Sequence, residues 1–322
     1  MLTSYLRILK LLVRKGKNLW MKLINLLQNR NFILISALGI GLLWGEGAQW
    51  TEPITLPALA IVMTLSTMGV PESIFRSFRG LLRPSMIGIV MNYFILGTTL
   101  IVLNAILIYD EALRLGFILI AAVPPAVAVI PFTYFLKGDE TLSLIGTAGA
   151  YLGALIIMPL SALLFLGPGF IDPMKLMVIM LELILLPLIA SRLLLRIGMA
   201  SRLDSVKGPI TNWSFFLLTY TIVGLNRDLI LNQPLLLSPV VIIALLSTFL
   251  LGWGIEKVGT LFHAPKKTLT SLVLLGTLKN YGLAGGLALA LFSKKTSVPA
   301  TVSAVFMIVY IIWLEFRVRG NR

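Results

Sequence analysis

The sequence predicts an all-α polytopic membrane protein whose ten transmembrane helices form two inverted five-helix repeats. Three observations lead to this fold class: the composition, ten apolar runs, and an internal match between two interrupted runs. Hydrophobic residues make up 58% of the 322 residues and charged residues only 12%. Soluble domains carry roughly twice that share of charge, so the composition places the chain among membrane proteins.

Apolar runs long enough to cross a bilayer follow one another along most of the chain. A spanning helix needs about 17 to 25 residues, and a shorter run suffices when it pairs with another across a break. We expect spans at 31–47, 53–70, 84–108, 115–136, 141–166, 174–195, 210–226, 234–255, 268–292 and 297–316. The first repeat then covers 31–166 and the second covers 174–316.

The two ends of the chain are basic. Residues 1–30 contain no acidic residue, and their Lys and Arg alternate with leucines, which predicts an amphipathic helix at the membrane surface. A secretory signal would need an apolar run and a cleavage site soon after the charges. Residues 317–322 form a basic tail. With both termini inside, the cytoplasmic segments hold most of the 27 Lys and Arg, which predicts a multi-pass protein of the plasma membrane in that orientation.

The net charge of +14 has its simplest explanation in this orientation and in anionic lipid headgroups. We therefore expect the lipid bilayer as a partner and no nucleic acid. The chain has no cysteine and a single histidine, which excludes thiolate and imidazole metal sites. No nucleophile motif is present either, so we expect no enzyme and no cofactor.

Two of the spans are interrupted at matching positions. Residues 117–140 align with 272–295, an offset of 155 residues, and Pro124-Pro125 then falls on Lys279-Asn280. A tandem proline removes two amide donors, breaks the helix and leaves carbonyl groups that need partners. Because five spans separate the copies, they enter the membrane from opposite sides. Broken helices paired in this way are typical of secondary transporters.

Lys279 lies near the middle of its span. Lys267 is twelve residues away, about 18 Å along a helix, which a lysine side chain of about 6 Å cannot reach across. A charge at this depth is costly and points to a functional or paired role. Glu182 is the only carboxylate well inside another span, and we hypothesise that it contacts Lys279, directly or through water, in one transport state. The alternative is that Glu182 faces a wet cavity or another partner.

Three stretches resemble the bile acid:sodium symporter family. They are "TMGVPESIFRSFRGLLRPSMIGIVMNYF" (67–94), "TYFLKGDETLSLIGTAGAYLGALIIMP" (133–159) and "KNYGLAGGLALALF" (279–292). The resemblance implies a panel domain and a core domain whose fourth and ninth helices are unwound and cross. It also implies secondary transport of a small organic anion, a carboxylate or a sulfonate, by alternating access.

The family's first sodium site is only partly retained. The resemblance implies a Ser-Asn pair at the fourth-helix crossing and hydroxyl groups from the fifth helix. Here the pair has become Val129-Ile130, while Ser143 and Thr147 keep the hydroxyls. Thr133 is a further candidate oxygen for this region.

The second sodium site is altered more strongly. The resemblance implies a glutamate and a glutamine of the ninth helix and a glutamine of the third helix. Leu275 replaces the glutamate, Lys279 replaces the ninth-helix glutamine, and Asn92 stands where the third-helix glutamine would be. Asn280 keeps the asparagine of the crossing point. We therefore expect the Lys279 ammonium to take the place of a sodium ion.

Transport would then be sodium-independent or coupled to protons. Several alternatives stay open: a sodium-coupled organic anion symporter with atypical sites, a non-transporting receptor or scaffold of the same fold, or an exporter of the arsenite or auxin type. The absence of cysteine argues against arsenite carriers that rely on one. The sequence leaves open whether the protein is a monomer or a dimer.

Overall fold

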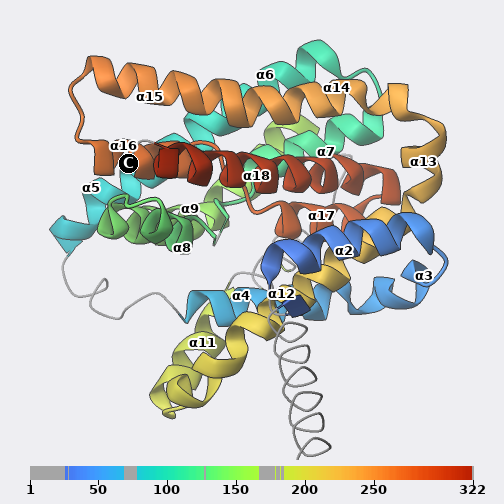
Figure 1. Ribbon diagram of the computed structural model, residues 1–322, viewed down its shortest axis with the longest axis horizontal. Helices are drawn as coiled ribbons and strands as arrows, with labels where there is room; N and C mark the ends of the chain where they lie inside the picture. The colour runs from blue at the N-terminus through green and yellow to red at the C-terminus, as the bar shows by residue number, and fades with distance from the viewer. Residues whose placement is uncertain are drawn as a thin grey trace, which may run out of the picture.

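The computed structural model describes residues 26–27, 29–68, 78–126, 128–166, 178, 182 and 185–320. All named elements in this part of the chain are helices (Figure 1). The surface helix predicted for residues 1–30 lies almost entirely outside the described residues. At the other end, the last helix continues to Gly320, so most of the predicted tail extends that helix.

The helices form a smaller and a larger group. The smaller group occupies the lower part of Figure 1. It contains α2 (Arg30–Leu43), α3 (Ala48–Thr51), η1 (Glu52–Ile54), α4 (Thr55–Thr67), α11 (Leu186–Arg196) and α12 (Ala200–Leu225). α12 packs along both α2 and α4, and α11 packs on α4. Helices from both halves of the chain therefore share this group.

The larger group lies above it in Figure 1. Its first half contains α5 (Phe78–Ile89), η3 (Val90–Gly97), α6 (Thr98–Leu107), α7 (Glu111–Ala122), α8 (Val129–Phe135) and α9 (Glu140–Leu166). After the connecting α13 (Arg227–Asn232), its second half contains α14 (Pro234–Leu245), η5 (Leu246–Leu250), α15 (Leu251–Leu261), α16 (Lys266–Leu275), α17 (Tyr281–Leu291) and α18 (Lys294–Gly320). η3 and η5 are π-helical segments inside otherwise α-helical runs.

Four helices within the described residues are long and apolar enough to cross a membrane. They are Leu81–Leu107, Glu140–Phe165, Pro234–Leu261 and Lys294–Val318. Phe32–Leu43 and Tyr281–Leu291 are shorter apolar helices. The described part of the chain thus has the helix lengths and composition of an integral membrane protein.

Small residues allow the helices of the larger group to approach closely. A Cβ atom added at Gly88 of α5 would lie 2.1 Å from the carbonyl oxygen of Gly146 on α9, and one added at Gly149 would lie 2.3 Å from the Cβ of Ser85. Membrane helices commonly associate through such small residues, because close backbone approach increases van der Waals contact. α9 also packs on α7, α8 and α16, so the α5–α9 pair lies against both broken helices.

Candidate functional site

Both helix interruptions expected from the sequence are present, and they meet. The first lies between α7 and α8 and the second between α16 and α17. Pro125 and Lys279 face each other in an isolated antiparallel bridge. Residues separated by more than 150 positions in the sequence therefore share one crossing in the middle of the larger group.

The two unwound segments satisfy each other's backbone groups. The amide of Asn280 donates to the carbonyl of Pro124 at 3.0 Å, and the amide of Ala126 donates to the carbonyl of Leu278 at 3.2 Å. Unwound backbone is tolerated inside a membrane only where such partners exist. The crossing is thus a short paired segment that replaces the helical bonds lost at each break.

The Lys279 ammonium is enclosed at this crossing. The residue is 0% exposed. Its Nζ donates to Asn92 Oδ1 at 2.8 Å, to the carbonyl of Ala121 at 2.7 Å and to the carbonyl of Val123 at 2.8 Å. Nζ also lies 4.6 Å from the ring centroid of Tyr93, within the range of a cation–π contact. An ammonium has three N–H donors, and all three have an acceptor.

The proline break explains why these carbonyls are available. In a continuous helix the Ala121 carbonyl would accept a bond from the amide of residue 125, but Pro125 has no N–H. Val123 follows the last residue of α7, so no further helical turn supplies an amide donor to its carbonyl. The first break therefore creates acceptors, and the lysine of the second break supplies the donors.

Asn92 connects this centre to a third helix. It lies in the π-helical segment η3 and is 0% exposed. While its Oδ1 accepts from the ammonium, its Nδ2 lies 3.4 Å from the Leu275 carbonyl and 3.5 Å from the Leu278 carbonyl, which are long contacts. π-helical segments occur frequently at functional sites. Lys279 and Asn92 together hold α7, η3 and the second break in one arrangement.

Asn280 joins the crossing to the smaller helix group. Its Oδ1 accepts from the amide of Leu283 at 3.0 Å and caps α17. Its Nδ2 donates to the Tyr151 hydroxyl at 2.9 Å and lies 3.4 Å from the sulfur of Met63 on α4. A single side chain at the break therefore contacts both groups of helices.

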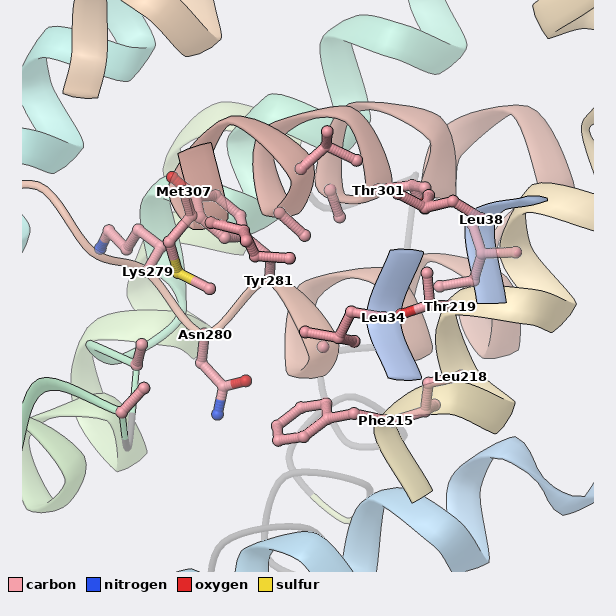
Figure 2. A pocket seen from close by; sticks show the side chains of 18 residues that line it. Leu34, Leu38, Phe215, Leu218, Thr219, Lys279, Asn280, Tyr281, Thr301 and Met307 are labelled. Carbon is pink, nitrogen blue, oxygen red and sulfur yellow. The ribbon is translucent and has the colours of Figure 1, made fainter. Parts of the chain in front are cut away.

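A cavity of about 70 Å³ lies between the two helix groups, beside the crossing (Figure 2). Its walls come from α2, α12, α17, α18 and the residues before α8. Most of the lining is apolar, and the polar side chains include Thr219, Thr301 and Asn280. Lys279 lines the edge, but its ammonium extends away from the side chains gathered around Phe215 (Figure 2). The ammonium thus lies behind the cavity wall.

Comparison with known proteins decides the family. The sequence model of the sodium bile acid symporter family matches residues 56–233, which is more than half of the chain. The chain belongs to this family. It is also 26% identical over 226 residues to YocS of Bacillus subtilis (strain 168), whose name describes an uncharacterized sodium-dependent transporter, and the alignment covers 69% of each chain. The protein is therefore a membrane transporter of the bile acid symporter type.

The family match ends before the second broken helix, so Lys279 lies outside it. At the expected first sodium position, Val129 is 0% exposed and Ile130 is half-buried. At the expected second position, Leu275 is 0% exposed, and both Val129 and Leu275 belong to the apolar core. The Ser143 and Thr133 hydroxyl oxygens lie 2.7 Å apart. Thr147 is buried, and its Oγ1 has no hydrogen-bond partner. Two of these three hydroxyl groups thus bond to each other, and the third is buried and unpaired.

The contact between Glu182 and Lys279 that we hypothesise for one transport state is not made in this conformation and stays a prediction. Glu182 is exposed, whereas Lys279 is fully buried and its three N–H groups are already bonded. The three ion pairs found between described residues of the protein involve neither Glu182 nor Lys279. The acceptors of the ammonium in this conformation are two backbone carbonyls and the Asn92 side-chain oxygen.

Other partners of the crossing were not expected from the sequence. They are Tyr93 against the ammonium, and Tyr151 and Met63 against Asn280. Tyr93 directly follows Asn92, but Phe94 is a second aromatic residue in the same span, and nothing in the sequence shows which of the two faces the ammonium. Met63 and Tyr151 lie on helices far apart in sequence, and only the folded arrangement brings them to Asn280.

Proposed function

We propose that this symporter-family member carries a small organic anion, a carboxylate or a sulfonate, by alternating access, and that the Lys279 ammonium takes the place of a sodium ion. The observation that carries the proposal is the bonding of the ammonium. Three oxygens surround Nζ at 2.7–2.8 Å, with no carboxylate among them.

The replacement of a sodium ion by the Lys279 ammonium follows from the ligands that each cation needs. A sodium ion at a protein site needs several oxygen ligands, and here a covalently attached cation uses three that meet at the crossing. Because the ammonium belongs to the chain, it cannot cross the membrane with the substrate. Transport is then sodium-independent, or coupled to protons if the amine exchanges its proton in another conformation.

The electrostatics favour an anionic substrate. A buried charge without a counter-ion strongly attracts an opposite charge, since little water screens it. The N-terminus of α17 adds a positive helix end, and its residues Tyr281 and Gly282 line the cavity. Because Nζ lies behind the wall, the ammonium acts through its field, while the apolar lining suits the body of an organic acid.

Alternating access requires two bodies that move against each other. We assign the smaller helix group to the panel and the larger group to the core. Asn280 of the core contacts Met63 of the panel, and the cavity lies between the two groups. Movement at this boundary would expose the cavity to either side of the membrane.

Helix boundaries support two inverted repeats of five spans, 31–166 and 174–316. An offset of 155 residues relates α9 to α18 to within one residue at each end. The same offset aligns η3 with η5 and α7 with α16 in the sequence. We further propose that both termini lie in the cytoplasm and that the protein resides in the plasma membrane, as the distribution of basic residues predicts.

A thermal-shift screen of organic acids followed by uptake into proteoliposomes tests the proposal. Wild type and Lys279→Gln are compared in sodium and in choline at several pH values. We expect an organic acid to raise Tm of the wild type equally in both salts, and uptake to persist without sodium. In Lys279→Gln, uptake should fall at least about tenfold. Lys294→Gln is the matched control, because Lys294 is exposed outside the crossing.

Different outcomes separate the alternatives. Uptake by the wild type that depends steeply on the sodium gradient would refute the substitution and favour a sodium-coupled symporter with atypical sites. If no organic acid shifted Tm and no uptake occurred, a non-transporting receptor or scaffold would be favoured. A gain of sodium dependence in Lys279→Gln would strengthen the proposal, since it would show that the vacated oxygens can bind the ion.

A further inference from the structure

A second cavity lies in the core group, away from the crossing. Its volume is about 550 Å³, and it opens between the C-terminal ends of α15 and α18 and the N-terminal half of α16. Apolar side chains form its inner wall: Leu136, Leu269, Val273, Leu274, Leu314 and Val318. The lining residues Thr260, His263, Lys266 and Arg317 are exposed and define its mouth. The cavity is therefore amphipathic along its depth.

The mouth of this cavity is positively charged. Glu256 is the only acidic residue in the lining, and its carboxylate pairs with the guanidinium of Arg317. Lys266 also lines the mouth, and within the described residues its ammonium has no carboxylate partner. His263 completes the rim. An anion entering here would meet one unpaired cation and a second that is shared with Glu256.

Aromatic residues place the mouth at the level of a membrane interface. Lys257 lies 5.9 Å from the ring centroid of Trp253, and Arg317 lies 5.3 Å from that of Trp313, each basic residue one helical turn from its tryptophan. Such tryptophan belts mark the headgroup region of a bilayer. Phe262, beside the mouth, is 77% exposed, which also suits contact with lipid. The ligand with the readiest access is thus a lipid.

α16 reinforces the charge of the mouth. The helix begins at Lys266, directly after Pro265, and no side chain caps its N-terminus. The free amides of a first helical turn carry a partial positive charge and favour anions. They add to the side-chain charges of Lys266 and Arg317 on the same side of the cavity.

We propose that this cavity binds an anionic phospholipid. Its phosphate lies between Lys266 and Arg317, and one acyl chain lies along Leu269, Val273 and Leu314. Basic pockets between membrane helices on the cytoplasmic side bind acidic headgroups by the same physics, and this mouth is on the side predicted to be cytoplasmic. The proposal does not depend on the substrate or the coupling ion of transport.

The bound lipid would support the crossing from outside. Its acyl chain would contact α16, which ends just before the second break, and Leu136, which follows α8 of the first broken helix. Both half-helices would then share one apolar ligand. We therefore expect lipid binding to raise the thermal stability of the protein.

Binding can be measured on the full chain in detergent, by native mass spectrometry and by Tm. The probes are phosphatidylglycerol, phosphatidylcholine with the same acyl chains, and glycerol phosphate. We expect phosphatidylglycerol to bind and raise Tm, phosphatidylcholine to bind at least about fivefold more weakly, and glycerol phosphate to have no effect. Lys266→Gln should weaken phosphatidylglycerol binding about fivefold, as expected for one interfacial charge.

Three variants make the test specific. Lys257→Gln removes a lysine beside the cavity and should leave binding unchanged. The double variant Glu256→Gln with Arg317→Gln keeps the net charge but removes the guanidinium, so it should weaken binding as Lys266→Gln does. Thr270→Trp fills the cavity and should weaken both lipids. Equal losses in Lys257→Gln and Lys266→Gln, equal binding of the two lipids, or binding of glycerol phosphate alone would each overturn the proposal.

Discussion

The two broken helices have similar architecture and different chemistry. Each consists of two half-helices around an unwound segment, and the segments pair in antiparallel fashion. The first break is made by Pro124-Pro125, which removes amide donors and leaves carbonyls unpaired. The second break carries Lys279-Asn280, whose side chains are rich in N–H donors. One break thus supplies acceptors, and the other supplies donors.

This difference shows how a symmetric backbone can hold an asymmetric site. Identical breaks would each leave unpaired carbonyls, and a bound cation would be needed to hold them together. Here the Lys279 ammonium joins the Ala121 and Val123 carbonyls to Asn92. The crossing is held by side-chain and backbone groups of the chain itself.

The largest expected effect comes from removing the donors of the second break. Lys279→Met has a similar length and removes all three N–H groups, so Asn92 Oδ1 and two carbonyls lose their partner inside the membrane core. We expect a loss of about 2 to 4 kcal/mol of unfolding free energy, because each buried unsatisfied acceptor is costly. Equilibrium unfolding in mixed micelles, with Lys294→Met as control, measures it.

Removing the ammonium also removes the cost of burying a charge. If Lys279→Met were as stable as the wild type or more stable, that desolvation cost would exceed the value of the three hydrogen bonds. The comparison between donor and acceptor breaks would then explain the position of the lysine but not the stability of the fold.

A second change keeps the donors and cancels their charge. Asn92→Asp preserves an acceptor 2.8 Å from Nζ and adds a carboxylate to the buried ammonium. The long Nδ2 contacts that it loses are weak. If the ammonium attracts the substrate through its field, anion affinity should fall about tenfold while Tm stays within a few degrees. Isothermal titration with the best organic acid measures it, and unchanged affinity would exclude a role for the charge.

A third change restores a donor to the first break. Pro125→Ala supplies an amide that can bond the Ala121 carbonyl and so competes with the ammonium. We expect a net loss of about 1 kcal/mol, since a charged hydrogen bond is exchanged for a neutral one. Pro124→Ala is the matched control. Its new amide can bond the carbonyl of residue 120, which Lys279 does not contact. Equal effects of the two variants in thermal unfolding would contradict the assigned role of Pro125.

Much of the fold and part of the site could be predicted from the sequence. Apolar runs predicted an all-helical membrane protein, and four of the predicted spans are helices long enough to cross a membrane. The tandem proline located the first break, and the internal match located the second. Family resemblance placed Asn92 opposite Lys279, and the structure brings their side chains into contact. Each of these predictions depends on a local sequence pattern or on an alignment of positions, and both can be read from a single sequence.

The partners of the ammonium could not be predicted in the same way. In the sequence, the natural counter-ion for the Lys279 ammonium is a carboxylate. Glu182 is the only carboxylate well inside another span, so it is the expected partner. The actual acceptors include backbone carbonyls, which every residue has, and only the geometry of the break exposes those of Ala121 and Val123. The contact of Asn280 with Met63 depends likewise on how the two helix groups pack.

The smallest expected effect concerns a contact outside the crossing that joins the two halves of the core. Lys295, at the start of α18, bonds the carboxylate of Asp110 at 2.6 Å, and Asp110 also caps α7 through the amide of Leu113. Partial burial raises the pKa of the Asp110 carboxyl, but its hydrogen bonds with Lys295 and backbone amides outweigh this, so the pKa lies below its ordinary value.

A lowered pKa in the folded state stabilises the ionised form. The contribution of Asp110 is therefore present above the ordinary aspartate pKa of about 3.9 and is lost as pH falls through the lower folded value. Asp110→Asn keeps the helix cap and removes the ion pair, so we expect a loss of about 0.5 kcal/mol at pH 7 and none at pH 2. Lys295→Gln should have the same effect. A loss in Asp110→Asn that persisted at pH 2 would show that the contribution of Asp110 to stability does not come from its ion pair with Lys295.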